Sequence, residues 1–471
     1  MPSTNRRLVV RAALLVALLA PVWGCANGDG SAAPDGPADG KPSPERPATP
    51  GLGRILVGGR AVTGSEPSGN AKVPYRRTYT DGELYAPVTG YRSTAFGAAG
   101  LEGVYGDELT AGVSGGGRTS GDVTTTIDPS VQRAAMEGLR GHKGAAVALD
   151  AGTGQLLAVA STPSYDPGRF SGNTTADTEA WKRLMRDPDK PMLNRALREA
   201  LAPEGTFGVV VAAAALERGL YASVDDSTRS PAPYTAPGSA SEFSDDPAHC
   251  RNASIRNALR HGCHNVFAAM AVEMGQPAVA AMAEAFGFNG EELRTPVRLE
   301  ASVYPRSGVN GADVAFAGAG LGGVTATPVQ MARVVAAVAN GGERVDPQMV
   351  AKVVRADGSV VKPAEDAARR AKRIMRRGTA EQLRSALETS AAGARAGGGT
   401  GAVIGGTSGR VTPSPSYGDG ATAWFVSYAR TGEGGLIACA VRITDADGGA
   451  GEPAGSAPAV RVAELMGRAT A

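Results

Sequence analysis

The sequence predicts an α/β chain of the α+β type, in which helices flank a central antiparallel sheet behind a small N-terminal module. Two apolar runs, at 144–149 and 155–160, are joined by Asp150-Ala-Gly-Thr-Gly154, a turn sequence typical of a β-hairpin. Two more runs of strand length lie at 422–427 and 436–442. A central antiparallel sheet with helices on both faces fits this order of elements.

Helices are predicted around these strands. Residues 123–127 form a β-branched strand, and Asp128 is placed to cap a helix over 129–139. The segment 209–218 is almost wholly apolar, so a helix there must be buried. The later helices are predicted at 328–338, ended by Asn340-Gly-Gly342, and at 457–466.

The first 25 residues have the layout of an export signal. A basic start precedes an apolar run over 12–22, which is shorter than the roughly 20 residues that a membrane span needs. Val22-Trp-Gly-Cys25 resembles a lipoprotein cleavage box, so we expect Cys25 to be lipidated. An uncleaved anchor and simple secretion are the alternatives. All three place the body of the protein outside the cytoplasm, where disulfides are permitted.

Composition divides the rest of the chain. Residues 26–50 are rich in Pro, Gly, Ala and Asp without an apolar period, which predicts a disordered tether. Residues 51–121 alternate short apolar runs with turn signals and predict a small module with its linker, and residues 122–471 hold the predicted sheet. The 48 Lys and Arg residues nearly balance the 46 Asp and Glu residues, which argues against nucleic acid as a partner.

A series of short motifs follows in order along the chain. They are Gly82-Glu-Leu-Tyr85, Val88-Thr-Gly-Tyr91, Thr126-Ile-Asp-Pro-Ser-Val-Gln132, Val147-Ala-Leu-Asp150, Ser161-Thr-Pro-Ser-Tyr-Asp-Pro167, Asn194-Arg-Ala-Leu197, Thr327-Pro328, Ala339-Asn-Gly-Gly342 and Ala423-Trp-Phe425. In order and spacing they resemble the transpeptidase domain of class B penicillin-binding proteins, in its actinobacterial branch. The resemblance spans roughly residues 51–467. It implies the fold shared with serine β-lactamases and a dimerisation-like N-terminal module.

Enzymes of this family carry three motifs, S-x-x-K, S-x-N and K-T-G. The serine begins a helix and attacks the stem-peptide carbonyl, after the lysine one turn later has taken its proton. The stretch that matches the first motif reads Pro203-Glu-Gly-Thr-Phe-Gly208. Gly205 therefore stands at the nucleophile position and Gly208 at the lysine position.

The other two motifs lose their functional groups as well. The second aligns with Gly262-Cys-His264, so Gly262 replaces the serine and His264 the asparagine. The third aligns with Gly405-Gly-Thr-Ser-Gly409, and Gly406 replaces the lysine. We therefore expect no active catalytic residue. The polar side chains that remain, which we expect to contact a bound ligand, are Thr206, Asn265, Thr407 and Ser408.

Histidines and cysteines cluster before and within the second motif. His249, His261 and His264 lie close to Cys250 and Cys263. The resemblance favours a Cys250–Cys263 disulfide, with free thiols or a metal site as alternatives. The spacing follows no standard zinc pattern, so no metal or other cofactor is expected. A nucleophilic Cys263 is a further alternative, but adjacent side chains on a helix diverge.

These observations predict a membrane-tethered pseudo-transpeptidase of the cell envelope. It would bind a peptidoglycan stem peptide, or a protein of cell-wall synthesis or division, without turning it over. One alternative is an active D,D-transpeptidase or carboxypeptidase with non-standard catalytic residues. Another is a β-lactam sensor that binds its ligand only noncovalently.

Overall fold

The computed structural model describes residues 51–114, 120–290, 295–306, 310–368, 371–395, 403–411, 422–444 and 457–470. The predicted export segment, Cys25 and the tether over 26–50 lie outside the described residues. All described residues belong to one unit, which runs from Ala48 to Ala471.

The predicted central sheet has five strands in the order β16-β17-β18-β8-β9, and all neighbours are antiparallel. They are β8 (Gly144–Asp150), β9 (Leu156–Thr162), β16 (Val403–Val411), β17 (Thr422–Arg430) and β18 (Leu436–Ile443). The predicted hairpin joins β8 to β9. The Asp150 carboxylate accepts hydrogen bonds from the amides of Gly152 (3.0 Å) and Thr153 (2.7 Å), and Gly154 takes φ +78°. Strands β9 and β16 form the two edges.

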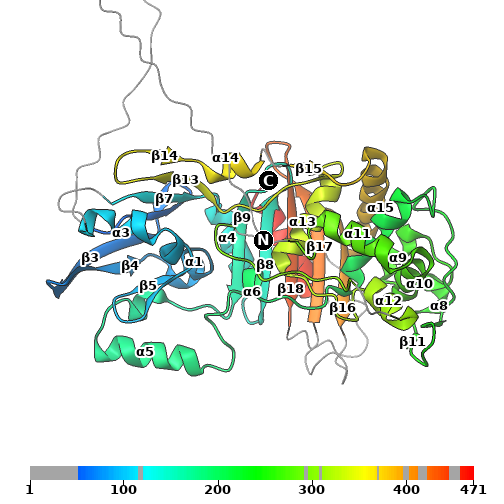
Figure 1. Cartoon of the computed structure of the whole chain (residues 1–471), viewed down its shortest axis with the longest axis horizontal. Coiled ribbons are helices and arrows are strands. Elements are labelled where there is room, and N and C mark those ends of the chain that lie inside the picture. Colours follow the sequence, from blue (N-terminus) through cyan, green and yellow to red (C-terminus); the bar gives the residue numbers. More distant parts are fainter. Residues whose placement is uncertain are drawn as a thin grey trace, which may run out of the picture. The chain divides into compact units, whose positions relative to one another are not determined.

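Helices cover both faces of this sheet (Figure 1). The side chains of Val147 and Leu149 enter a cluster with α7 (Gly208–Glu217) and α13 (Pro328–Ala339). The alternate side chains of Ala146 and Ala148 enter a second cluster with α4 (Pro129–Gly138) and α16 (Ala457–Arg468). This is the two-residue period of a strand that is buried on both sides. The predicted cap is also present, because the Asp128 carboxylate accepts from the amides of Ser130 and Val131.

The chain between β9 and β16 supplies most of the helices. They are α5 (Thr175–Arg186), α6 (Arg195–Arg198), α8 (Pro247–Cys250), α9 (Ile255–His261), α10 (His264–Met274), α11 (Gln276–Phe286), α12 (Gly311–Gly318), α14 (Pro363–Ala368) and α15 (Arg377–Arg395), with 3-10 turns η1 (Pro167–Phe170) and η2 (Glu204–Phe207). Short strand pairs join β10 (Tyr234–Thr235) to β11 (Glu242–Phe243) and β12 (Glu343–Arg344) to β15 (Lys372–Arg373). No single described helix meets the length and apolarity of a membrane span; α10 and α11 do so only as a pair, with a 109° bend between them.

The N-terminal module shares a sheet with later parts of the chain. That sheet has the order β14-β13-β7-β1-β2 and contains β1 (Ile55–Val57), β2 (Arg60–Ala61), β7 (Asp122–Thr125), β13 (Val350–Val354) and β14 (Val360–Val361). The module also holds α1 (Gly82–Thr89), α2 (Leu101–Val104), α3 (Gly106–Ser114) and the hairpins β3 (Thr63–Asn70) with β4 (Val73–Tyr79) and β5 (Tyr91–Ser93) with β6 (Gly97–Ala99). Because β1 pairs with β7, the segments on either side of residue 121 are joined by backbone hydrogen bonds.

Candidate functional site

The turn η2, which leads into the buried helix α7, is the point where the three motif regions meet. Glu204 takes φ +52°, a conformation that is uncommon for a residue with a side chain, and it sets Gly205 deep in the fold. A Cβ atom on Gly205 would lie 3.2 Å from the carbonyl oxygen of Ser408 and 3.9 Å from Nε2 of His264. Gly205 therefore faces both the second and the third motif, but it presents only backbone to them.

The space that a lysine would need at Gly208 is filled by an aromatic ring. A Cβ atom on Gly208 would lie 2.5 Å from Cε2 of Phe267, closer than van der Waals contact allows. Phe267 projects from α10 and is 1% exposed, so its ring has no free direction in which to move. Glycine at 208 is thus required by the packing of α7 against α10.

His264 is held between two carboxylates. Its Nδ1 lies 3.1 Å from Oδ1 of Asp245, and its Nε2 lies 3.6 Å from Oε2 of Glu204. The second Asp245 oxygen accepts the backbone N–H of Asn265 at 2.7 Å. The side chain of Glu204 is 4% exposed and that of Asp245 is 13% exposed. We call these three residues, Asp245, His264 and Glu204, the ionic triad.

The triad sets the protonation state of its members. Burial alone would lower the pKa of His264, but the hydrogen bond to Asp245 and the nearby charges of Asp245 and Glu204 outweigh it and raise that pKa to about 10. Burial would raise the pKa of Asp245, but the contact with His264 and two backbone amides lowers it. Burial raises the pKa of Glu204, and His264 offsets only part of that effect. At neutral pH His264 is therefore an imidazolium, which has no lone pair with which to accept a proton.

Two predicted ligand contacts at the first and second motifs are turned inward instead. Thr206 is fully buried, and its hydroxyl donates to the carbonyl oxygen of Pro203. Asn265 is also fully buried, and its amide donates to the carbonyl oxygens of Ser230 (3.1 Å), Pro231 (3.0 Å) and Cys250 (3.0 Å). Both side chains hold the local chain together through these hydrogen bonds.

The backbone conformation explains why glycine occupies position 262. It ends α9 with φ +69°, and its N–H donates to the carbonyl oxygen of Ala258. This is the left-handed C-terminal cap that glycine adopts without steric cost.

Gly406, which aligns with the lysine of the third motif, lies in β16. A Cβ atom there would lie 2.8 Å from Cβ of Ser427 and 3.0 Å from Cζ of Phe425, in the cluster beneath α4 and α16. Gly406 thus faces away from η2, because successive residues of a strand point to opposite faces. Thr407 and Gly409 are the residues on the η2 side, and a Cβ on Gly409 would lie 3.0 Å from the Gly205 nitrogen.

Neither predicted side chain of the third motif is aimed at Gly205. The Thr407 hydroxyl is buried and donates to the carbonyl oxygen of Leu259 at 2.9 Å, which ties β16 to α9. Ser408 is half-buried and reaches Gly205 through its carbonyl oxygen. At this point β16 therefore presents backbone atoms to Gly205.

The predicted disulfide between Cys250 and Cys263 is present. It closes the loop that carries the second motif, and Cys263 directly precedes α10. The rings of His249 and His261 stack outside it with centroids 4.3 Å apart. No group of three or more His, Cys, Asp or Glu side chains among the described residues is arranged to hold a metal ion. Cys439 is buried and free, and burial raises its pKa to about 12.

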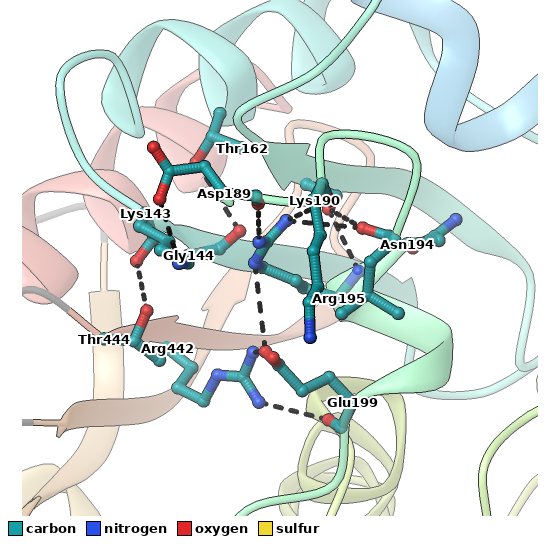
Figure 2. A network of polar contacts seen from close by, with 12 residues as sticks. Lys143, Gly144, Thr162, Asp189, Lys190, Asn194, Arg195, Glu199, Arg442 and Thr444 are labelled. Atoms are coloured by element: carbon teal, nitrogen blue, oxygen red, sulfur yellow. Dashed lines mark hydrogen bonds and ion pairs between the residues drawn. The ribbon is translucent and has the colours of Figure 1, made fainter. Parts of the chain in front are cut away.

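A second buried charge network lies behind η2 and fixes the chain that enters it. Figure 2 shows Glu199 between the guanidinium groups of Arg195 and Arg442. Both arginine side chains are almost fully buried, at 1% and 0% exposed. Arg442 also lies over the ring of Trp424, whose Nε1 donates to the carbonyl oxygen of Ala202 at 2.9 Å. The network therefore anchors the residue before Pro203 to the central sheet.

Sequence patterns did not reveal Asp245, Glu204 or Phe267 as parts of the site. Asp245 lies 19 residues before His264, in a polar stretch that resembles an ordinary loop. Glu204 was visible only as the second residue of the first motif. The one available signal was that Glu204 and His264 each fall inside a motif stretch.

Comparison with known proteins identifies the fold. Residues 144–466 match the penicillin binding protein transpeptidase domain, and residues 52–115 match the penicillin binding protein A dimerisation domain. The chain is 30% identical to the peptidoglycan D,D-transpeptidase PbpA of Mycolicibacterium smegmatis, over 89% of this chain and 88% of that protein. It is 32% identical to PbpA of Mycobacterium tuberculosis, over 63% of this chain and 64% of that protein.

Solved structures agree with the sequence matches. The crystal structure of PBPA from M. tuberculosis superposes with a TM-score of 0.79 at 25% identity, covering 89% of this chain and 99% of that chain. A structure of the same relative as a ceftriaxone acyl-enzyme complex gives the same TM-score. The protein therefore belongs to the penicillin-binding-protein transpeptidase family, with a dimerisation domain of the penicillin-binding protein A type at its N-terminal end.

Proposed function

We propose that this protein is a non-acylating member of its family, which serves peptidoglycan synthesis by binding rather than by transpeptidation. Its ligand is a stem peptide or a partner protein of the cell-wall machinery. The observation that carries the proposal is Gly205, which stands where the motif regions meet and has no side chain. Acyl transfer needs an oxygen or sulfur nucleophile at that point, and backbone atoms cannot supply one.

The groups that would activate a nucleophile are missing as well. Phe267 fills the space beside Gly208, so α7 itself carries no amine at the position of the family lysine. The histidine nearest to Gly205, His264, is already protonated between Asp245 and Glu204. Among the described residues, no hydroxyl or thiol is hydrogen-bonded to a lysine or histidine of this site. The geometry thus favours the pseudoenzyme over the active-transpeptidase alternative.

A binding role remains open to the strand β16. Its only strand partner is β17, so its other edge faces no described strand. An extended peptide can add to such an edge through main-chain hydrogen bonds, which need no catalytic side chain. We place the stem peptide there, beside the backbone of Ser408.

Labelling with a fluorescent penicillin tests the proposal. We expect no covalent band after denaturation and no mass increase of the intact protein, while an active penicillin-binding protein in the same experiment is labelled. Gly205→Ser is the informative variant, because it restores a hydroxyl within reach of His264 Nε2. We expect it to stay unlabelled at neutral pH, since the imidazolium cannot accept the proton.

Each outcome has a distinct meaning. A labelled wild-type protein would restore the active-enzyme alternative and end the proposal. A labelled Gly205→Ser variant with an unlabelled wild type would show that only the nucleophile is missing. A penicillin-dependent thermal shift without a covalent band would favour the noncovalent β-lactam sensor.

We also propose that the protein is held at the outer face of the membrane by a lipid on Cys25. The cleavage-box sequence and the basic, apolar start support this. Cells that express the full chain and receive a clickable palmitate analogue should label the wild type but not Cys25→Ser. If both proteins are unlabelled and both stay in the membrane fraction, the uncleaved anchor is correct.

A further inference from the structure

A cavity of about 850 Å³ lies at the opposite edge of the central sheet from Gly205. It is bounded by the first turn of α1, by α4 with the loop after it, and by the residues that follow β9. Strands β9 and β16 are separated by four strand spacings, or about 19 Å. The cavity is therefore distinct from the degenerate transpeptidase site, and its volume is that of a small-molecule or short-peptide site.

One wall of the cavity comes from α4 and the turn after it. Arg133, Met136 and Glu137 line it from one side of α4, and Arg140 lines it from the turn that follows Gly138. Both arginines are exposed, and neither is in an ion pair among the described residues. Two guanidinium groups thus border the cavity, one on α4 and one in the turn that follows it.

The facing wall comes from α1 and carries the opposite charge. Asp81 and Glu83 line the cavity there and are exposed. This wall is fixed to the transpeptidase domain, because the Ser164 hydroxyl donates to the Glu83 carbonyl oxygen (2.7 Å) and the Gln132 amide donates to the Leu84 carbonyl oxygen (3.0 Å). The α1 wall is therefore linked directly to the α4 wall, since Gln132 lies on α4.

Other charges at the rim are already engaged. Lys143 pairs with Asp189 at 3.1 Å, a contact that is visible in Figure 2. Asp166 accepts the backbone N–H of Gly168 at 2.9 Å. The charges left for a ligand among the described residues are Arg133 and Glu137 on α4, Arg140 in the turn after it, and the two acids at the start of α1.

We propose that this cavity binds a short zwitterionic peptide, with its carboxylates on Arg133 and Arg140 and its free amine on Glu83 or Glu137. A peptide of about this size with several carboxylates and a free amine has the chemistry of a peptidoglycan stem peptide that contains a diamino acid. Guanidinium–carboxylate pairs give the strongest and most directional of these contacts. The site goes beyond the proposed function, since it does not use η2, His264 or β16.

The test measures binding of a synthetic stem pentapeptide with diaminopimelate at its third position, by calorimetry at low salt. The paired variant Arg133→Gln/Arg140→Gln should weaken binding about tenfold or more, because it removes two charge-assisted hydrogen bonds to the peptide carboxylates. The matched control is Arg183→Gln/Arg186→Gln on α5, which removes the same charge from another exposed helix. It should leave the dissociation constant within about twofold.

Two results would overturn the proposal. One is no binding to the wild type at millimolar peptide, and the other is equal weakening by the two arginine pairs. An N-acetylated, carboxyl-amidated pentapeptide should bind no better to the wild type than the charged peptide binds to the cavity variant. The penicillin experiment reports on Gly205 and not on this cavity, so either proposal can fail without the other.

Discussion

Replacing His264 with glutamine will lower the free energy of unfolding by about 3 kcal/mol at neutral pH. The change removes the cation between Asp245 and Glu204 and leaves two buried carboxylates facing each other. Urea unfolding with the disulfide intact measures the loss. The double variant His264→Gln/Glu204→Gln should recover part of it, because only one carboxylate then remains. A loss below about 0.5 kcal/mol would contradict the ionic triad as described.

The same residue gives a pH dependence with a defined sign. Its pKa is about 10 in the folded chain and about 6.5 when unfolded. A raised pKa stabilises the fold fully below about pH 6.5, and this contribution is lost as pH rises through 10. The lowered pKa of Asp245 has the opposite pH dependence. Its contribution to the stability of the fold is present at neutral pH and is lost as pH falls through the acidic range. The stability difference between wild type and His264→Gln should therefore shrink from pH 7 to pH 10.

Replacing Glu199 with glutamine will destabilise the protein by about 3–5 kcal/mol. It leaves the buried guanidinium groups of Arg195 and Arg442 without their shared carboxylate. Burial lowers the pKa of Arg442 to about 10, and Glu199 is the group that opposes this effect. Chemical unfolding of the folded variant, or loss of soluble protein, reports the change.

A neighbouring ion pair provides the control for Glu199. Arg198 and Glu300 are 3.7 Å apart, with side chains 41% and 46% exposed. Glu300→Gln removes the same charge from a solvent-exposed pair and should cost less than about 1 kcal/mol. If both variants lose the same stability, the burial of the Glu199 network is not the cause.

Much of the fold was predictable because its signals are local. The Asp150–Gly154 turn, the Asp128 cap and the two-residue period of β8 each depend on residues that are neighbours in sequence. The disulfide was predictable from the resemblance. The side of the sheet that Gly406 faces could not be predicted. A strand pattern shows that successive residues alternate between the two faces, but not which of the two sets faces η2. The ionic triad could not be predicted for a similar reason, since its three members come from separate segments of the chain.

The sequence by itself determined what this site lacks. A hydroxyl at 205 and amines at 208 and 406 are not encoded, and folding cannot supply a side chain that the chain does not contain. Only the tertiary structure decided the surroundings of these positions. The ring of Phe267 lies against Gly208, two buried carboxylates keep His264 protonated beside Gly205, and Gly406 faces the side of the sheet away from η2. These depend on how distant segments pack, because burial and charge pairing are properties of the assembled fold.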